Sequence, residues 1–316
     1  MGKGYPEPLS ASLGTSWGAI AVDVFFIASG FFIAASFSYK TNLKSFVMAR
    51  ALRIFPGLFV VTALSACILG PVFTTLSITE YFSDYHWLQY LVKNSLLITG
   101  IEYNLPGVFT QNPYPLAVNG SLWTLPYEIK MYFLLVVFCS LFSYIQRSLK
   151  LSIYTNRRFF TSLTLAALCL HLVNFFQEFY EGEFLKLFFM FFVGSTFFFF
   201  KDKIHLNKQY GLATISLLLA SCIHPTTFFI TYTFCLAYIV FYLAYIPKGA
   251  IRSFNKIGDY SYGIYIYGFP VQQIVAASIP GISILAMISV SFLITVVLAT
   301  LSWNLIEERA LRLKSS

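Results

Sequence analysis

Apolar residues form long continuous runs along most of this sequence. About 20 consecutive apolar residues in a helix cross the hydrocarbon core of a bilayer. Strands of a membrane barrel would alternate between apolar and polar residues, and these runs do not alternate. The pattern therefore predicts an all-α fold, a polytopic transmembrane helical bundle with about nine spans. The spans are expected at residues 17–37, 53–73, 125–146, 159–177, 184–200, 209–223, 226–245, 259–279 and 282–304.

One further apolar stretch, 87–101, is about fifteen residues long, which is marginal for a crossing. Residues 102–124 follow it and are rich in Pro, Asn and Gly. Irregular backbone at membrane depth persists only where it is buried in protein or lines a wet cavity. We therefore expect 87–101 to be a short re-entrant or interfacial segment, and 102–124 to lie outside, beside the bilayer.

Charged residues predict the orientation of the spans. Lysine and arginine gather after the last span and in every second loop before it, at residues 40–52, 147–158, 201–208 and 248–258. The intervening loops hold acidic residues such as Glu80, Asp84 and Glu183. Basic loops stay on the cytoplasmic side of a membrane, so these four loops are predicted to be cytoplasmic. The polar N-terminal segment 1–16 is then expected outside.

Composition indicates a membrane protein without a soluble catalytic domain. Only 11% of the 316 residues are charged and 58% are hydrophobic, whereas soluble domains carry about 25% charged residues. Residues 17–314 are expected to form one membrane domain in contact with lipids. Cytoplasmic loops explain the formal net charge of +8, so no nucleic-acid partner is predicted. The five cysteines are dispersed without a C-x-x-C pair, so neither a metal site nor a disulfide is predicted.

The segment VDVFFIASGFF is the first candidate for chemistry, because it places Asp23 close to Ser29 and Gly30 inside an apolar run. Asp23 lies about 9 Å along the helix from the start of its span at Trp17. An acid at that depth is costly and is a functional candidate by default. The alternative is a carboxylate that reaches the outer interface or caps a neighbouring loop, and the sequence leaves both interpretations open.

The segment RALRIFPG places Arg50 and Arg53 at the cytoplasmic mouth of a span. Their i, i+3 spacing puts both guanidinium groups on one helix face. Planar guanidinium forks suit phosphate oxygens. Spacing alone favours the alternative, an ordinary pair of topology anchors, because any membrane protein can carry arginines there.

The segment NGSLWTLPYEIKMYFLL places Asn119, Ser121, Trp123 and Glu128 before or at the start of a span on the outer face. Glu128 and Tyr132 are four residues apart and share a helix face. Glu128 is a candidate to orient a hydroxyl or a protonated base, and the alternative is an acid that stabilises a helix N-terminus. Trp123 also fits the aromatic belt at a membrane interface.

Together these segments resemble the membrane-bound acyltransferase-3 family of polysaccharide O-acetylases and nodulation-factor acyltransferases. VDVFFIASGFFI is similar to its V-D-x-F-F-x-x-S-G-F segment, RALRIFPGLFVV to its R-x-x-R-I-x-P segment, and SLWTLPYEIKMYFLL to its W-S-L-x-x-E-x-x-F-Y segment. YSYGIYIYGFPVQQ and LSWNLIEERALRLK resemble its closing S-Y-x-x-Y and W-x-x-I-E motifs. The resemblance runs from Trp17 to Lys314, and the shared order of the motifs makes it specific.

The resemblance implies a helical bundle in a cell membrane, most simply a bacterial inner membrane, that transfers an acyl group to a sugar hydroxyl. The expected co-substrate is acetyl-CoA or another acyl-CoA, with no bound cofactor and no metal. The expected acceptor is an envelope glycan or a lipid-linked sugar. CoA is polyanionic and cytoplasmic, whereas the acceptor is polar and faces the other side. The predicted roles are donor binding for Arg50 and Arg53, catalysis for Glu128 and Asp23, and acceptor binding for Asn119, Ser121 and Trp123.

Two departures from the family pattern affect this expectation. The family begins with one more span, which carries the histidine expected to be its catalytic base, and this chain starts after it. Gly268 stands where the family often has a histidine. We therefore expect a shortened N-terminus and little transferase activity without an upstream helix. Two alternatives stay open: a catalytically inactive relative that acts as an assembly partner, and a glycan or lipid transporter or flippase, for which the sequence shows no internal repeat.

Overall fold

The computed structural model describes residues 9–39, 43–148, 154–247 and 258–313. Within these ranges every regular element is helical, apart from two isolated bridges that join Thr74 to Val108 and Asn104 to Ala117. The predicted all-α class is therefore confirmed for this part of the chain. Some basic residues of the predicted cytoplasmic loops and tail lie outside the described residues, namely Lys40, Lys150, Lys248, Arg252, Lys256 and Lys314.

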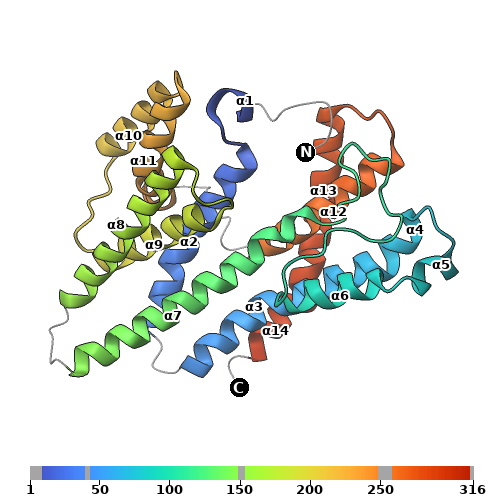
Figure 1. Ribbon diagram of the computed structural model, residues 1–316, viewed down its shortest axis with the longest axis horizontal. Coiled ribbons are helices and arrows are strands. Elements are labelled where there is room, and N and C mark those ends of the chain that lie inside the picture. Colours follow the sequence, from blue (N-terminus) through green and yellow to red (C-terminus); the bar gives the residue numbers. More distant parts are fainter. Residues whose placement is uncertain (1–8, 40–42, 149–153, 248–257, 314–316) are drawn as a thin grey trace. The chain divides into compact units, whose positions relative to one another are not determined.

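The chain divides into two compact units, which are described separately (Figure 1). The first unit comprises Met1–Tyr5, Asn42–Pro126 and Ser253–Ser316. The second comprises Pro6–Thr41 and Tyr127–Arg252. Each unit therefore combines segments that are far apart in the sequence.

The first unit is built around three long helices. Helix α3 (Leu43–Leu64) continues through a π-helical turn (Ser65–Leu69) into α4 (Gly70–Phe73). Two short helices follow, α5 (Ile78–Ser83) and α6 (His86–Leu96), and α6 packs against α3. Near the end of the chain α12 (Ser261–Ser278) packs on α13 (Ile284–Ser302), which continues through the π-helical turn Trp303–Glu307 into α14 (Glu308–Arg312).

The second unit is organised around the contact between α2 (Trp17–Tyr39) and α9 (Phe184–Phe200). Helix α8 (Tyr154–Gln177) packs on α9, and α11 (Pro225–Tyr245) packs on both α2 and α9. The remaining helices are α1 (Ser10–Leu13), α7 (Leu125–Ser148) and α10 (Lys208–Ser221).

Six of the predicted spans correspond to helical segments that are long and apolar enough to cross a membrane. These segments are Trp17–Ser38, Leu43–Phe73, Gly120–Phe142, Arg157–Gln177, Pro225–Tyr245 and Ile284–Arg312. Helix α9 is a shorter apolar helix of 17 residues, and α10 has only 14. A helix of 14 residues is about 21 Å long, less than the ~30 Å hydrocarbon core. Helix α12 has 18 residues but carries Gln272 and Gln273. A total of nine crossings therefore stays a prediction.

The marginal stretch 87–101 forms only the 11-residue helix α6, which is too short to cross a bilayer. Tyr90 and Asn94 are buried on one face of α6, whereas Leu88, Val92 and Leu96 are exposed on the other. This two-faced pattern is typical of a helix that lies at an interface.

Side chains hold the irregular segment between α6 and α7 in place. Gln273 on α12 donates from Nε2 to the carbonyl oxygens of Tyr114 and Ala117, at 2.7 and 2.5 Å. Asn112 returns a hydrogen bond from Nδ2 to the carbonyl oxygen of Gln273 at 3.0 Å. In a helix these carbonyl oxygens would accept hydrogen bonds from the backbone. Here they accept hydrogen bonds from polar side chains, as buried irregular backbone requires.

Helices α2 and α9 approach closely because each presents a glycine to the backbone of the other. A Cβ atom on Gly30 would lie 1.9 Å from the carbonyl oxygen of Phe191, and one on Gly194 would lie 2.0 Å from that of Ile27. Ser195 also donates its hydroxyl hydrogen to the carbonyl oxygen of Gly30 at 3.1 Å. Small residues at such crossings are typical of packed membrane helices. Gly30, the glycine of the S-G pair in VDVFFIASGFF, is therefore a helix-packing residue.

We predict that Gly30→Ala destabilises the protein by about 1–3 kcal/mol, because the added methyl group forces α2 away from α9. Gly18→Ala on the same helix is the matched control, because a Cβ there meets only the Ser16 hydroxyl oxygen at 3.7 Å. Thermal unfolding of both variants in one detergent measures the difference. An unfolding temperature of Gly30→Ala equal to that of the wild-type protein would contradict the close crossing.

Candidate functional site

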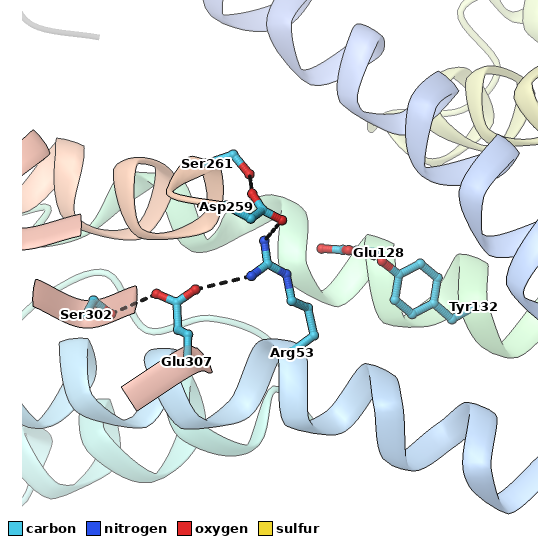
Figure 2. A network of polar contacts seen from close by, with 7 residues as sticks. All are labelled: Arg53, Glu128, Tyr132, Asp259, Ser261, Ser302 and Glu307. Atoms are coloured by element: carbon cyan, nitrogen blue, oxygen red, sulfur yellow. Dashed lines mark hydrogen bonds and ion pairs between the residues drawn. The ribbon is translucent and has the colours of Figure 1, made fainter. Parts of the chain in front are cut away.

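Arg53 is the centre of an ion-pair network in the first unit (Figure 2). Its Nη2 atom lies 2.6 Å from Oδ2 of Asp259, and its Nη1 atom lies 3.3 Å from Oε2 of Glu307. Ser261 donates to the other oxygen of Asp259 at 2.5 Å, and Ser302 donates to the other oxygen of Glu307 at 2.8 Å. In each carboxylate one oxygen thus accepts a hydrogen bond from a serine, and the other oxygen pairs with Arg53.

Aromatic rings complete the surroundings of Arg53. Its Cζ atom lies 5.6 Å from the ring centroid of Tyr262 and 5.7 Å from that of Trp303. Tyr262 is itself fixed, because its hydroxyl donates to the carbonyl oxygen of Ile54 at 2.8 Å. Ring faces attract a cation at these distances. Since the Glu307 side chain is only 1% exposed, this carboxylate depends on Arg53 for its counter-charge.

Arg50 precedes Arg53 by one turn of α3 and has different surroundings. Its Nε atom is buried and has no hydrogen-bond partner among the described residues. A buried donor without an acceptor is costly. The predicted donor-binding pair therefore consists of one arginine held by two carboxylates and one with an unused buried N–H group.

Asn119 has a structural position in the first unit, at the start of the 3₁₀ turn Gly120–Thr124. Its Oδ1 atom accepts from the backbone N–H of Ser121 at 3.2 Å, and its Nδ2 atom donates to the carbonyl oxygen of Ile266 at 2.9 Å. Asn119 is buried. The side chain therefore ties this turn to α12, and acceptor binding by Asn119 stays a prediction.

The rest of the 3₁₀ turn is fixed by Tyr265 of α12. The Tyr265 hydroxyl donates to the carbonyl oxygen of Ser121 and also hydrogen-bonds the hydroxyl of Thr124. Ser121 and Trp123 are both half-buried, and their predicted contacts with an acceptor are likewise untested. The S-Y-x-x-Y motif thus supplies Tyr262 beside Arg53 and Tyr265 beside the predicted acceptor residues.

In the second unit Glu128 is joined to two other motif residues. The Tyr132 hydroxyl donates to Oε1 of Glu128, and both side chains are drawn in Figure 2. The Ser29 hydroxyl oxygen lies 3.3 Å from the same Tyr132 oxygen. The shared helix face predicted for Glu128 and Tyr132 is confirmed. This arrangement brings the first and third sequence motifs together around a buried glutamate.

Asp23 is buried inside the second unit, with its carboxyl group between two helices. Its Oδ2 atom accepts from the Tyr232 hydroxyl at 2.8 Å, and its Oδ1 atom lies 3.6 Å from Nζ of Lys186. Lys186 also lies 2.7 Å from Oε2 of Glu183. Lys186 thus supplies the counter-charge that a buried carboxylate needs.

Sequence reasoning assigned no role to several residues of these networks, among them Lys186, Glu307, Tyr232 and Asp259. Lys186 had a usable signal, because a charged residue stands inside the apolar run FLKLFFMFF. Glu307 is the glutamate of the W-x-x-I-E motif, to which no role was assigned. Tyr232 carried no signal, because it is one among many tyrosines. Asp259 was expected only as the first residue of the span 259–279, without a role.

The histidines have mostly structural surroundings. His86 donates from its backbone N–H to Asp84, and its ring lies 2.5 Å from the same oxygen. These two contacts hold the pKa of Asp84 below its usual range. His224 accepts from the backbone N–H of Thr226 at the start of α11. His171 is buried against aromatic rings. Among the described residues, no three His, Cys, Asp or Glu side chains are placed to hold a metal ion.

Comparison with known proteins identifies the family of the chain. The sequence model of an acyltransferase domain matches residues 3–305. The chain belongs to the acyltransferase-3 family. The resemblance predicted from the sequence motifs is thereby confirmed, and this protein is an acyltransferase-3 membrane protein.

Two relatives add to this assignment. An O-acetyl transferase of Shigella phage Sf6 is 27% identical over 323 residues, which cover 98% of this chain and 89% of that protein. Nodulation protein 10 of Rhizobium leguminosarum bv. viciae is 31% identical over 121 residues, 36% of this chain and 31% of that protein. No solved structure gives a significant match.

We predict that Glu307→Ala lowers stability by about 1–3 kcal/mol, because it removes the buried carboxylate that both Arg53 and Ser302 bind. Glu308→Ala is the matched control. Glu308 is the next residue, and it pairs at 2.8 Å with an exposed Arg312, so its loss should cost less than about 1 kcal/mol. Unfolding midpoints of both variants in the same detergent measure the difference, and equal midpoints would contradict the network.

Proposed function

We propose that this protein is an integral membrane acyltransferase that O-acetylates a sugar hydroxyl of an envelope polysaccharide or its lipid-linked precursor. The observation that carries the proposal is the match to the acyltransferase family over residues 3–305. A relative named O-acetyl transferase aligns with 98% of the chain, which supports acetyl as the transferred group. Six helical segments are long and apolar enough to cross a membrane, which supports a multi-pass protein. The proposal also includes nine crossings and a location in a bacterial inner membrane.

The proposed donor is acetyl-CoA, a co-substrate rather than a bound cofactor. CoA is rich in phosphate, and guanidinium groups bind phosphate oxygens through paired N–H donors. Arg50 offers a buried Nε–H without an acceptor in the described part of the chain, and Arg53 is held in a fixed position by Asp259 and Glu307. These two arginines are therefore the proposed donor-binding residues.

The proposed reaction is direct transfer. A sugar hydroxyl oxygen forms a bond to the acetyl carbonyl carbon, the carbon–sulfur bond of the thioester breaks, and CoA leaves with its thiol sulfur. The hydroxyl proton passes to a base, and carboxylates serve in this role. Glu128 and Asp23 are the proposed catalytic carboxylates, and each already accepts a hydrogen bond from a tyrosine hydroxyl. Asn119, Ser121 and Trp123 are proposed to contact the acceptor.

Transfer of labelled acetyl from acetyl-CoA tests the proposal directly. The full chain in lipid nanodiscs is incubated with labelled acetyl-CoA and with glycan and lipid-linked sugar extracted from the host envelope. We expect alkali-labile label on the sugar fraction. Donor binding without transfer would indicate the inactive relative, and movement of unlabelled glycan across vesicles without transfer would indicate a transporter. The same assay also tests the opposite expectation from the sequence, that the chain has little transferase activity.

We predict that Arg50→Lys and Arg53→Lys each raise the KM for acetyl-CoA by about tenfold or more, because lysine keeps the charge but loses the planar fork. Arg312→Lys is the control, because this side chain is 74% exposed and pairs with Glu308 on the same helix. Initial rates at varied acetyl-CoA measure the effect. Unchanged KM and rate in both variants would reduce Arg50 and Arg53 to topology anchors.

A further inference from the structure

A cavity of about 290 Å³ lies within the second unit, among α2, α8, α9 and α11. Its polar wall is formed by Asp23, His171, Asn174, Glu183, Lys186 and Tyr232. Small-molecule sites in proteins typically measure about 300–1,000 Å³. The cavity is therefore just below this range and suits one small ring rather than an extended chain.

Asp23 lines this cavity and carries an acceptor atom that no hydrogen bond uses. Asp23 is 1% exposed, and its Oδ1 atom has no hydrogen-bond partner among the described residues. Lys186 is ion-paired with this oxygen, but at 3.6 Å the contact is longer than an ordinary hydrogen bond. A buried carboxylate oxygen without a donor is costly, so this atom points to a ligand that donates an O–H or N–H group.

Other polar atoms around the cavity also have unused capacity. Asn174 uses Oδ1 to accept from the backbone N–H of Tyr180 at 2.8 Å, which leaves its Nδ2 hydrogens for a second partner. The ring of His171 stacks on Phe189 with 5.6 Å between centroids. The cavity thus offers a mixture of donors and acceptors, as several hydroxyl groups on one ligand require.

Apolar rings form the rest of the wall. Phe175 and Phe229 both line the cavity, and their rings stack with centroids 3.5 Å apart and planes 6° apart. Phe228 and Met190 also line it. Flat aromatic surface beside a few polar groups is typical of a small-molecule site, and it matches a ring that carries C–H groups on its face and hydroxyl groups on its edge.

The charges of the wall select against an anionic ligand. Asp23 and Glu183 contribute two carboxylates, and Lys186 contributes one ammonium group. Lys186 is already paired with Glu183 at 2.7 Å. A further carboxylate or phosphate would therefore meet net like charge.

We propose that this cavity binds one neutral sugar ring of the acceptor, with Asp23 Oδ1 accepting a hydrogen bond from a ring hydroxyl. This inference rests on the proposed function and deepens it by naming the acceptor subsite. The cavity is lined from the start of α2, the end of α8 and the starts of α9 and α11. The distribution of basic loops predicts all four of these helix ends to be on the outer side, where an envelope glycan is available.

Binding of free methyl glycosides tests this subsite without any acyl transfer. The full chain in nanodiscs is titrated with the methyl glycosides of glucose, galactose and rhamnose, and with glucuronate, by saturation-transfer NMR. We expect at least one neutral glycoside to bind and glucuronate to bind about tenfold more weakly or less. Absence of binding by every neutral glycoside, or equal binding of glucuronate, would overturn the proposal.

Two isosteric variants locate the site. Asp23→Asn should weaken the neutral glycoside by about tenfold or more, because the charged acceptor is lost. Glu183→Gln should instead strengthen glucuronate binding, because the net negative charge of the wall is removed. Asp202→Asn is the control, since that side chain is 70% exposed on another loop of the same unit. Unchanged glycoside binding in Asp23→Asn, or unchanged glucuronate binding in Glu183→Gln, would overturn the assignment.

The outcomes separate this inference from the proposed function. Sugar binding that depends on Asp23, together with no acetyl transfer, would support the subsite and contradict the enzyme. Acetyl transfer by the wild-type protein, without binding of any neutral glycoside in the cavity, would overturn the subsite and leave the enzyme standing. Thermal unfolding of each variant is measured as well, so that only folded proteins are compared.

Discussion

The close crossing of α2 and α9 is the contact on which the second unit depends. Gly30 and Gly194 allow the two backbones to meet, and this approach places Asp23 of α2 beside Lys186 of α9. Both charged groups stand inside strongly apolar helices, where an unpaired charge is costly. Packing of small residues and pairing of buried charges are thus consequences of one helix contact.

In the first unit, too, a buried charge must be paired, but the residues that pair it are arranged differently. Glu307 is buried, and its two oxygens are used by Arg53 and Ser302. Asp259 and the ring of Trp303 surround the same guanidinium group. In both units, charged residues that would disrupt an apolar helix are held by partners from distant parts of the sequence. Such residues are costly to retain, which makes them the natural candidates for binding and catalysis.

Much of the helical fold was predictable, because a membrane span is encoded locally by a run of apolar residues. Six predicted spans reappear as long apolar helices, and the short helix α6 was expected from its length. The family was also predictable, since its motifs stand in order along the chain. Pairings such as Asp23 with Tyr232, or Arg53 with Asp259, join residues some 200 positions apart, and no local pattern specifies which tyrosine or aspartate closes the network.

We propose that this acyltransferase-3 protein places acetyl esters on an envelope glycan. The decisive measurement is proton NMR of surface polysaccharide purified from host cells with and without expression of the chain. We expect acetyl resonances that appear only with the chain and disappear after mild alkali. Polysaccharide without acetyl esters, from cells whose membranes contain the folded protein, would contradict it.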